Sequence, residues 1–281
     1  MFKEIETTPT LKLKQRLSDS ELERVCWVYQ KRIQTLTWDN PQASIVVPCH
    51  NEEYYILGML EYMSRLQTQL PLQFIWVDNN CTDRTGDILK LCGFTCVQEK
   101  RKGTSYARQA WLEATKSDLV FTTDADSLVP SRWIDACRNY FLNDHSLVCL
   151  SGWSQPYRPW IIKTFYVIDR FRYKIMKLGG AKGTQAINFP WHNSVLKRNI
   201  ALKIGGYEPG SDMWEDNIIA RKMAEQWRIR RIDDNPEIQV ITSGRRMAST
   251  YLLLIAMLEK LPYAFQNKDK WVSGRTFSDV R

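Results

Sequence analysis

Short apolar segments alternate with amphipathic segments along the first half of the chain. Residues 44–48, 73–78, 94–98 and 119–123 are rich in β-branched and aromatic side chains, which is typical of buried strands. Between them, apolar residues recur at helical spacing over residues 52–65, 83–91 and 104–115. This alternation predicts an α/β fold with a Rossmann-like, mostly parallel twisted sheet flanked by helices.

Polar residues follow closely behind these predicted strands. Asn51, Asp78, Asp124 and Asp126 all come at the carboxyl ends of apolar runs. Ligands of open α/β sheets bind at that edge. We therefore expect these side chains to converge on one edge of the sheet.

The periodicity also divides the chain into three parts. Residues 11–36 predict one or two helices, which end at the break formed by Trp-Asp-Asn-Pro at 38–41. We expect a helical extension at 1–41, a main domain at 42–247 and a helical tail at 248–281. Within the later part, the pattern predicts helices at 160–176, 214–227 and 249–261, a glycine-rich loop at 179–193, and strands at 229–232 and 238–242.

Composition narrows the class of protein. The chain has 281 residues, 44% of them hydrophobic, and a net charge of +8, which favours anionic partners such as phosphates or acidic lipid. Its seven cysteines are scattered and suggest free thiols in a reducing cytoplasm. No apolar run approaches the ~20 residues that span a bilayer, and we see no signal peptide. We expect a cytoplasmic protein; residues 249–261 could also dock on the inner face of a membrane, although core packing explains that helix more simply.

Asp124 and Asp126 are the strongest candidate ligands for a cation. In an extended or turning segment, residues two apart point the same way. Two carboxylates aimed at one point repel each other unless a cation lies between them, and Mg²⁺ and Mn²⁺ favour carboxylates combined with substrate phosphates. Asp-x-Asp also arises by chance in surface turns; the preceding apolar strand favours the metal-binding interpretation.

Two further regions of this edge are suited to nucleotide binding. Asp78 can accept a hydrogen bond from a base or ribose, or it can shape a turn. The segment at residues 48–53 should open a helix whose free N–H groups attract anions. After the third strand, Lys102 precedes a glycine turn and suits a diphosphate, and Arg108 lies near the alanine face of the next helix and so faces the crevice.

The later half offers a candidate base and candidate acceptor contacts. Glu215 and Asp216 open a helix, where acids complement the helix dipole; a carboxylate there can also take a proton from an attacking hydroxyl. Arg245 and Arg246 stand on a glycine turn and suit phosphate. Trp191 and Trp214 could stack on sugar rings, although most tryptophans pack in cores or interfaces.

Taken together, these motifs resemble the family 2 glycosyltransferases of the GT-A fold. The segments that carry the likeness are SIVVPCHNEE, VDNNCTDRTGDI, KGTSYARQAWLEA, FTTDADSLVPSRWID and WEDN, in that order over about residues 43–247. The resemblance implies a nucleotide-binding half at about 42–130 and an acceptor half at about 131–247. It also implies a nucleotide-sugar donor, linked to UDP or GDP, and mostly inversion at the transferred sugar.

The resemblance further implies a role for individual residues. The nucleotide would contact Pro48, His50, Glu52, Asp78 and Lys102, and we add Asn51 and Arg108 from their positions. Asp124 and Asp126 would hold Mn²⁺ or Mg²⁺, and Asp124 would also reach the ribose and diphosphate. Asp216 would act as base, with Glu215 orienting the acceptor.

The chain departs from the family pattern in places. His50 stands where an aromatic residue is more usual. SGRRM stands near the place where processive members carry Gln-x-x-Arg-Trp, which favours a single transfer. The acceptor is left open and could be a lipid, a glycan or a small metabolite.

Two alternative functions remain open from the sequence. A nucleotidyltransferase would use a similar sheet and metal, but no Gly-rich triphosphate loop follows the first strand. A non-enzymatic basic protein that binds a membrane surface or nucleic acid would account for the charge, but we find no nucleic-acid recognition motif and expect no nucleic-acid partner. The oligomeric state is not predicted.

Overall fold

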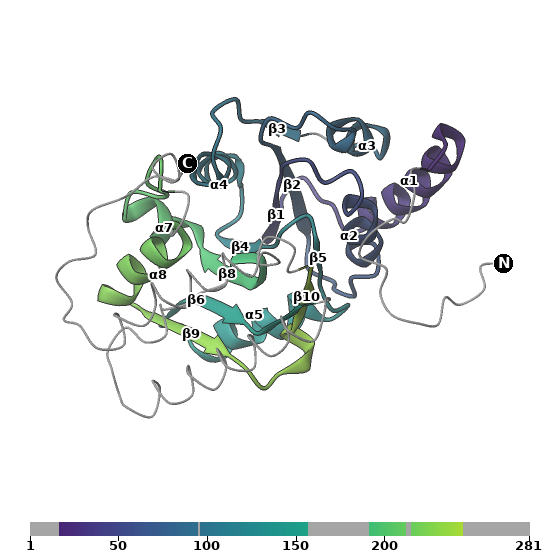
Figure 1. Cartoon of the computed structure of the whole chain (residues 1–281). Helices are drawn as coiled ribbons and strands as arrows, with labels where there is room; N and C mark the ends of the chain where they lie inside the picture. The colour runs from purple at the N-terminus through teal and green to yellow at the C-terminus, as the bar shows by residue number, and fades with distance from the viewer. Residues whose placement is uncertain (1–16, 95, 157–190, 212–214, 244–281) are drawn as a thin grey trace.

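The computed structural model describes residues 17–94, 96–156, 191–211 and 215–243. Its centre is a seven-stranded sheet in the order β3-β2-β1-β4-β8-β6-β9 (Figure 1). The strands are β1 (Ala43–Cys49), β2 (Leu72–Asp78), β3 (Cys96–Gln98), β4 (Leu119–Thr122), β6 (Leu147–Gly152), β8 (Ser194–Lys197) and β9 (Arg228–Ile232).

Strand direction matches the predicted mostly parallel sheet. β3, β2, β1 and β4 are parallel neighbours, and β6 is parallel to β9. β8 lies between β4 and β6 and is antiparallel to both. The α/β fold class is therefore confirmed, with one antiparallel strand in its second half.

A second, small sheet lies at the edge where β4 ends. It has the order β5-β10-β7, with bounds β5 (Ser127–Leu128), β7 (Ser154–Pro156) and β10 (Val240–Thr242). β5 follows β4 after a short loop, and β10 is antiparallel to it. The small sheet therefore joins residues next to the aspartate pair to residues near 240.

Helices cover both faces of the central sheet (Figure 1). They are α1 (Asp19–Gln34), α2 (Ile56–Met63), α3 (Thr85–Leu91), α4 (Thr104–Ala114), α5 (Trp133–Asn143), α7 (Arg198–Lys203) and α8 (Glu215–Gln226), with short 3₁₀ helices η2 (Trp191–Asn193) and η3 (Pro236–Ile238). β1 shows how the two cores arise: Ile45 and Val47 pack with α1, α2 and α5, whereas Val46 packs with α4, α7 and α8. Alternate side chains of one strand therefore serve opposite layers.

The predicted N-terminal helix forms as α1. Ser18 caps it, because its hydroxyl accepts from the Glu21 N–H while the Glu21 side chain accepts from the Ser18 N–H. Leu22, Cys26 and Ile33 point inward and belong to the same apolar cluster as the strands. α1 is thus packed on the core of the sheet domain.

Several predicted boundaries are corrected by the structure. The helix expected at 52–65 is α2, which begins at Ile56. The strand expected at 238–242 is shortened to β10 because η3, opened by Pro236, takes up its first residue. β6 and β8 were not predicted. The helices expected at 160–176 and 249–261, and most of the loop at 179–193, lie outside the described residues.

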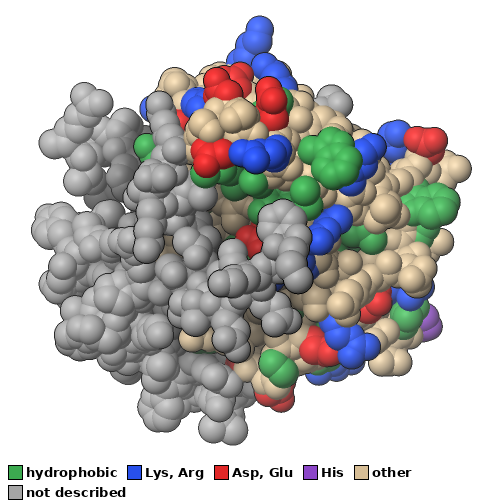
Figure 2. Space-filling view, turned by 90° about the vertical axis from the view of Figure 1, so that its right-hand side faces the viewer, with side chains coloured by type: hydrophobic (Ala, Val, Ile, Leu, Met, Phe, Trp, Pro, Cys, Tyr) green, Lys and Arg blue, Asp and Glu red, His purple; other side chains and the backbone are tan. Residues whose placement is uncertain are grey.

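The cysteines, the apolar character of the helices and the surface charges bear on the class of protein. All seven cysteines lie in the described part of the chain and are free thiols. None of the helices that the structure describes is both long and apolar enough to cross a membrane. Figure 2 shows the side of the molecule that carries α1, where basic and acidic side chains are interspersed over the described surface.

Candidate active site

The carboxyl ends of β1, β2 and β4 meet at one edge of the central sheet. Cys49 at the end of β1 pairs with Asp78 at the end of β2, and Val46 pairs with Thr122 at the end of β4. The structure thus brings the segments after these strands, with Asn51, Asp78 and Asp124, to a common edge. Pro48 lies inside β1 opposite Val77 and is partly exposed.

Asp78 both shapes a turn and remains at the sheet edge. Its Oδ1 accepts from the Cys81 N–H at 2.9 Å, and its Oδ2 accepts from Gln98 Nε2 at 3.2 Å. A carboxylate has about four lone-pair sites, so these two bonds leave acceptor capacity for a ligand. Gly86 approaches closely: a Cβ there would lie 3.3 Å from Asp78 Oδ2. Both roles weighed for Asp78 are therefore compatible with its contacts.

The segment after β1 does not form the expected helix start. Asn51 has a φ of 55°, and its Oδ1 accepts from the Thr82 N–H at 2.8 Å. The Glu52 N–H donates to Thr85 Oγ1 at 2.7 Å, and the Glu53 N–H donates to Asp83 Oδ2 at 3.0 Å. The prediction of free N–H groups at this point is wrong, because side chains of the loop after β2 accept hydrogen bonds from them before α2 begins.

The side chains of this segment divide between surface and interior. Glu52 is buried, with 2% of its surface exposed. His50 is exposed, and its Nδ1 lies 2.7 Å from the Asn79 carbonyl oxygen, to which it donates. One ring nitrogen of His50 is thus engaged by the turn after β2.

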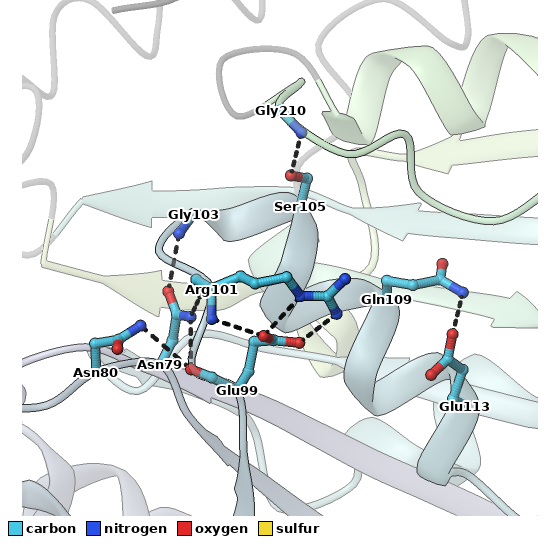
Figure 3. A network of polar contacts seen from close by, with 9 residues as sticks. All are labelled: Asn79, Asn80, Glu99, Arg101, Gly103, Ser105, Gln109, Glu113 and Gly210. Atoms are coloured by element: carbon cyan, nitrogen blue, oxygen red, sulfur yellow. Dashed lines mark hydrogen bonds and ion pairs between the residues drawn. The ribbon is translucent and has the colours of Figure 1, made fainter. Parts of the chain in front are cut away.

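A polar network fixes the loop between β3 and α4 (Figure 3). Glu99 accepts from Arg101 Nε at 2.9 Å and Nη2 at 2.7 Å. Asn79 Nδ2 donates to the Arg101 carbonyl at 2.8 Å, and its Oδ1 accepts from the Gly103 N–H at 3.3 Å. Arg101 is thus occupied by Glu99, whereas Lys102 is exposed and has no ion-pair partner among the described residues. Lys102, like Lys100 in the same loop, therefore remains available to a phosphate.

The aspartate pair lies in the loop between β4 and β5. Asp126 is 7% exposed, and the hydroxyl of Ser243 donates to its Oδ2. The Ser243 N–H also donates to the Asp126 carbonyl at 3.2 Å. Asp124 is partly buried and makes no side-chain hydrogen bond or ion pair within the ranges described. One carboxylate is therefore anchored and the other is free to bind a ligand.

Glu215 and Asp216 open α8 and face Arg108 of α4. Arg108 Nη1 lies 3.1 Å from Glu215 Oε1 and 3.9 Å from Asp216 Oδ2, and the side chains of Arg108 and Glu215 are 9% and 5% exposed. Burial would lower the pKa of Arg108, but Glu215 and then Asp216 raise it above its ordinary value. Arg108 was expected to face the crevice as a nucleotide contact; the structure pairs it with the acidic residues at the start of α8.

Asp216 has the electrostatics of a base. Burial raises its pKa above the ordinary value of 3.8, and the opposing effect of Arg108 limits the rise. A carboxylate with a raised pKa accepts a proton more readily than an ordinary one. Asp216 is also more accessible than Glu215, with 24% of its side chain exposed. The arrangement suits Asp216 for proton transfer and Glu215 for holding Arg108.

Sequence reasoning missed His192 at this site. It lies in η2, directly before β8, and its Nε2 atom is buried without a hydrogen-bond partner in the part of the chain described here. Burial lowers its pKa, whereas the negative charges of Asp124, Asp126 and Asp216 act in the opposite direction. A lone histidine after a glycine-rich segment gives no periodic signal; only the antiparallel pairing of β8 with β4 reveals its position.

The donor set at the aspartate pair fits a hard divalent cation. Two carboxylates stand two residues apart, and one has no protein partner. Among the described residues, no group of three His, Cys, Asp or Glu side chains is close enough to hold a metal ion. Mg²⁺ and Mn²⁺ commonly use one or two carboxylates and complete their shell with water and substrate phosphate. Of the remaining candidates, Trp214, Arg245 and Arg246 lie outside the described residues, as does the side chain of Trp191.

Comparisons with known proteins identify the family of the chain. A family model described as "Glycosyl transferase family 2" matches residues 44–205, more than half of the chain. The probable glycosyltransferase YdaM of Bacillus subtilis (strain 168) is 25% identical over 193 residues, which are 64% of this chain and 44% of YdaM. The chain thus spans less than half the length of this relative.

Solved structures show the same fold. The mannosyltransferase PcManGT from Pyrobaculum calidifontis, in complex with GDP-Man and Mn²⁺, has a TM-score of 0.61 at 19% identity, over 89% of this chain and 73% of that one. Glucosyl-3-phosphoglycerate synthase of Mycobacterium tuberculosis has a TM-score of 0.56 at 15% identity, over 96% and 93%. S. aureus TarS 1-349 with UDP-GlcNAc has a TM-score of 0.52 at 15% identity, over 81% and 68%. The fold is that of the GT-A glycosyltransferases.

Proposed function

This chain belongs to glycosyl transferase family 2 and is a glycosyltransferase, and we propose that it catalyses one metal-dependent, inverting sugar transfer from a nucleoside-diphosphate sugar to an acceptor hydroxyl. The match confirms the family resemblance that the motifs predicted. The donor carries UDP or GDP, because the structural neighbours include complexes with UDP-GlcNAc and with GDP-Man.

The observation that carries the proposal is the aspartate pair after β4, in which Ser243 anchors Asp126 while Asp124 has no side-chain partner among the described residues. Asp216 opens α8 beside Arg108. All three carboxylates act to raise the pKa of His192 against the effect of burial. The aspartate pair suits the diphosphate end of a donor, and Asp216 suits the acceptor end, so the transferred sugar belongs between them.

The proposed reaction is a single displacement. The acceptor oxygen attacks the anomeric carbon while its proton passes to a carboxylate oxygen of Asp216. The bond between that carbon and the diphosphate oxygen breaks, and the nucleoside diphosphate leaves with the bonding electrons. Attack opposite the leaving group inverts the anomeric configuration. Arg108 favours the ionised form of Asp216 against the effect of burial, and Glu215 holds Arg108 in place.

Asp124 and Asp126 would hold Mn²⁺ or Mg²⁺ against the diphosphate. When bound, the cation supplies charge stabilisation to the leaving nucleoside diphosphate. The chain's own contribution is to fix Asp126 through Ser243 and to leave Asp124 without a competing protein partner. Asp78, Lys102, His50, Asn51, Glu52 and Pro48 lie along the strand ends where the nucleotide would bind.

The acceptor half of the domain, at about 131–247, would select the acceptor, which we propose is a lipid or glycan. We also propose that the protein works in the cytoplasm. Residues 249–261 are explained more simply by core packing than by docking on the inner membrane face, and flotation with phosphatidylserine vesicles tests this: co-flotation that is lost on deletion of 249–261 would favour the membrane alternative.

Donor hydrolysis measures the proposed function without a known acceptor. Wild-type protein is incubated with UDP-glucose, UDP-GlcNAc or GDP-mannose and Mn²⁺, and nucleoside diphosphate release is followed. We expect at least one donor to be turned over, and EDTA to stop the reaction. Absence of turnover and of nucleotide-sugar binding across the panel would overturn the proposal.

Two variants assign the roles. Asp126→Asn should abolish the Mn²⁺-dependent turnover, whereas Asp87→Asn, a matched change at an exposed position of α3, should not. Asp216→Asn should reduce turnover at saturating donor while leaving donor affinity close to wild type. Equal turnover in Asp216→Asn would place the base elsewhere.

A further inference from the structure

His192 is held in place by its neighbours on both sides. β8 begins at Ser194, which pairs with Thr122 at the end of β4, so η2 lies where the aspartate loop begins. The next residue, Asn193, is fully buried: its Nδ2 donates to the carbonyls of Trp153 at 2.8 Å and Ile238 at 2.7 Å. Its Oδ1 accepts from Trp133 Nε1 at 3.0 Å. The backbone that carries His192 is therefore fixed to three separate segments.

The ring nitrogen has no partner in this rigid setting. Nε2 of His192 is buried, and within the ranges described it makes no hydrogen bond. A buried polar atom that lacks a partner is destabilising, and native proteins keep few of them. A nitrogen left in this state beside a substrate site is accounted for when a substrate group completes its hydrogen bond.

The surrounding charges restrict what that group is. Asp124 and Asp126 follow β4 and Asp216 opens α8; all three act to raise the pKa of His192, and Arg108, 3.9 Å from Asp216, acts to lower it. The carboxylates disfavour an anion that the cation does not hold, so a neutral group suits this nitrogen better than a second phosphate oxygen. A sugar hydroxyl is neutral and both donates and accepts, so it bonds to either tautomer of an imidazole.

We propose that His192 Nε2 hydrogen-bonds a hydroxyl group of the transferred sugar and thereby distinguishes a nucleotide sugar from the bare nucleotide. This rests on the proposed function, since it places the sugar between the aspartate pair and Asp216. It goes further because it assigns recognition of the sugar to one residue of η2, the short helix that immediately precedes β8. His192 is a substrate-binding residue in this assignment, independent of the base and the metal ligands.

The test compares binding of nucleotide sugars with binding of the nucleotides alone. Titration calorimetry in Mn²⁺ is run with UDP, UDP-GlcNAc, GDP and GDP-mannose, without acceptor. His192→Leu keeps a side chain of similar size but removes the nitrogen, and His192→Gln keeps an amide that reaches a similar position. His145→Ala, at an exposed position before β6, is the matched histidine control.

We expect His192→Leu to weaken the wild-type protein's preferred nucleotide sugar about tenfold while the corresponding nucleotide stays within about twofold, as one lost hydrogen bond requires. His192→Gln should recover part of the loss, and His145→Ala should change neither affinity. If His192→Leu is unstable, His192→Gln against His192→Ala gives the same comparison.

The remaining outcomes overturn the proposal. An equal loss for the nucleotide and its sugar, with weaker Mn²⁺ binding, would make His192 a metal ligand. No change in either affinity would leave it without a role in donor binding. Failure of the wild-type protein to bind any nucleotide sugar would instead refute the proposed function, so the two failures are distinct.

Discussion

Replacing Arg108 by methionine should reveal how strongly the acidic pair of α8 depends on one cation. Arg108, Glu215 and Asp216 are held together with little access to solvent, at 3.1 and 3.9 Å. At an effective dielectric of ~20, unit charges about 4 Å apart attract by about 4 kcal/mol, partly offset by desolvation of the guanidinium. Removal of one partner from a buried pair costs about 3–5 kcal/mol, because the other charge stays buried without compensation.

Urea denaturation at neutral pH measures this loss. Arg65→Met is the matched control, because Arg65 forms an exposed i,i+4 pair with Glu61, with 52% and 34% of the two side chains exposed. Such surface pairs contribute about 0.3–0.5 kcal/mol. We therefore expect Arg108→Met to lower the free energy of unfolding by about 3–5 kcal/mol and Arg65→Met by less than about 1 kcal/mol.

The pH dependence of the loss identifies its electrostatic origin. Burial already raises the folded-state pKa of Asp216 above 3.8, and loss of Arg108 raises it further. A carboxylate whose folded pKa is raised destabilises the folded state once pH exceeds its unfolded pKa. The difference between wild type and Arg108→Met should therefore shrink as pH is lowered towards 3.8. A loss no larger than that of Arg65→Met, or one independent of pH, would refute the reasoning.

Other consequences are equally measurable. Gly152→Ala should lower thermal stability by about 1–3 kcal/mol, because a Cβ there would lie 2.3 Å from the Ile238 carbonyl oxygen and 2.5 Å from Asn193 Nδ2; an unchanged Tm would contradict this close packing. Trp133→Phe should cost about 1–3 kcal/mol in urea denaturation by leaving Asn193 Oδ1 buried without its donor, and a neutral result would argue against that bond. Donor turnover should fall on the acid side with an inflection above pH 3.8, where Asp216 takes up a proton; Asp216→Asn should lack this inflection.

The nucleotide-binding half of the fold was predictable because its signals are local. β1, β2 and β4 are continuous apolar runs, and the polar residues that matter there follow each strand directly in sequence. The helix at α2 was misplaced by four residues because Asn51 forms a turn with residues 82–83. That contact joins two loops about thirty residues apart, so no window of sequence contains it.

The second half depends on pairing over longer distances. β8 is inserted antiparallel between β4 and β6, and this places His192 beside Asp124, 68 positions away in the chain numbering. Arg108 was expected to face the crevice, but in the structure it is paired with acidic residues on α8 that lie more than a hundred residues later. Sequence periodicity reports which face of an element is buried and not which element covers it.

The link between Ser243 and Asp126 has a consequence for the order in which this protein matures. Ser243 follows β10, the middle strand of the small sheet, and holds Asp126 across 117 positions of the chain. A ribosome that has already produced the nucleotide-binding strands has not yet delivered the residue that secures the aspartate loop. A nascent chain ending before residue 240 would therefore lack the anchor of that loop, and catalytic competence should emerge only after β10 has left the exit tunnel.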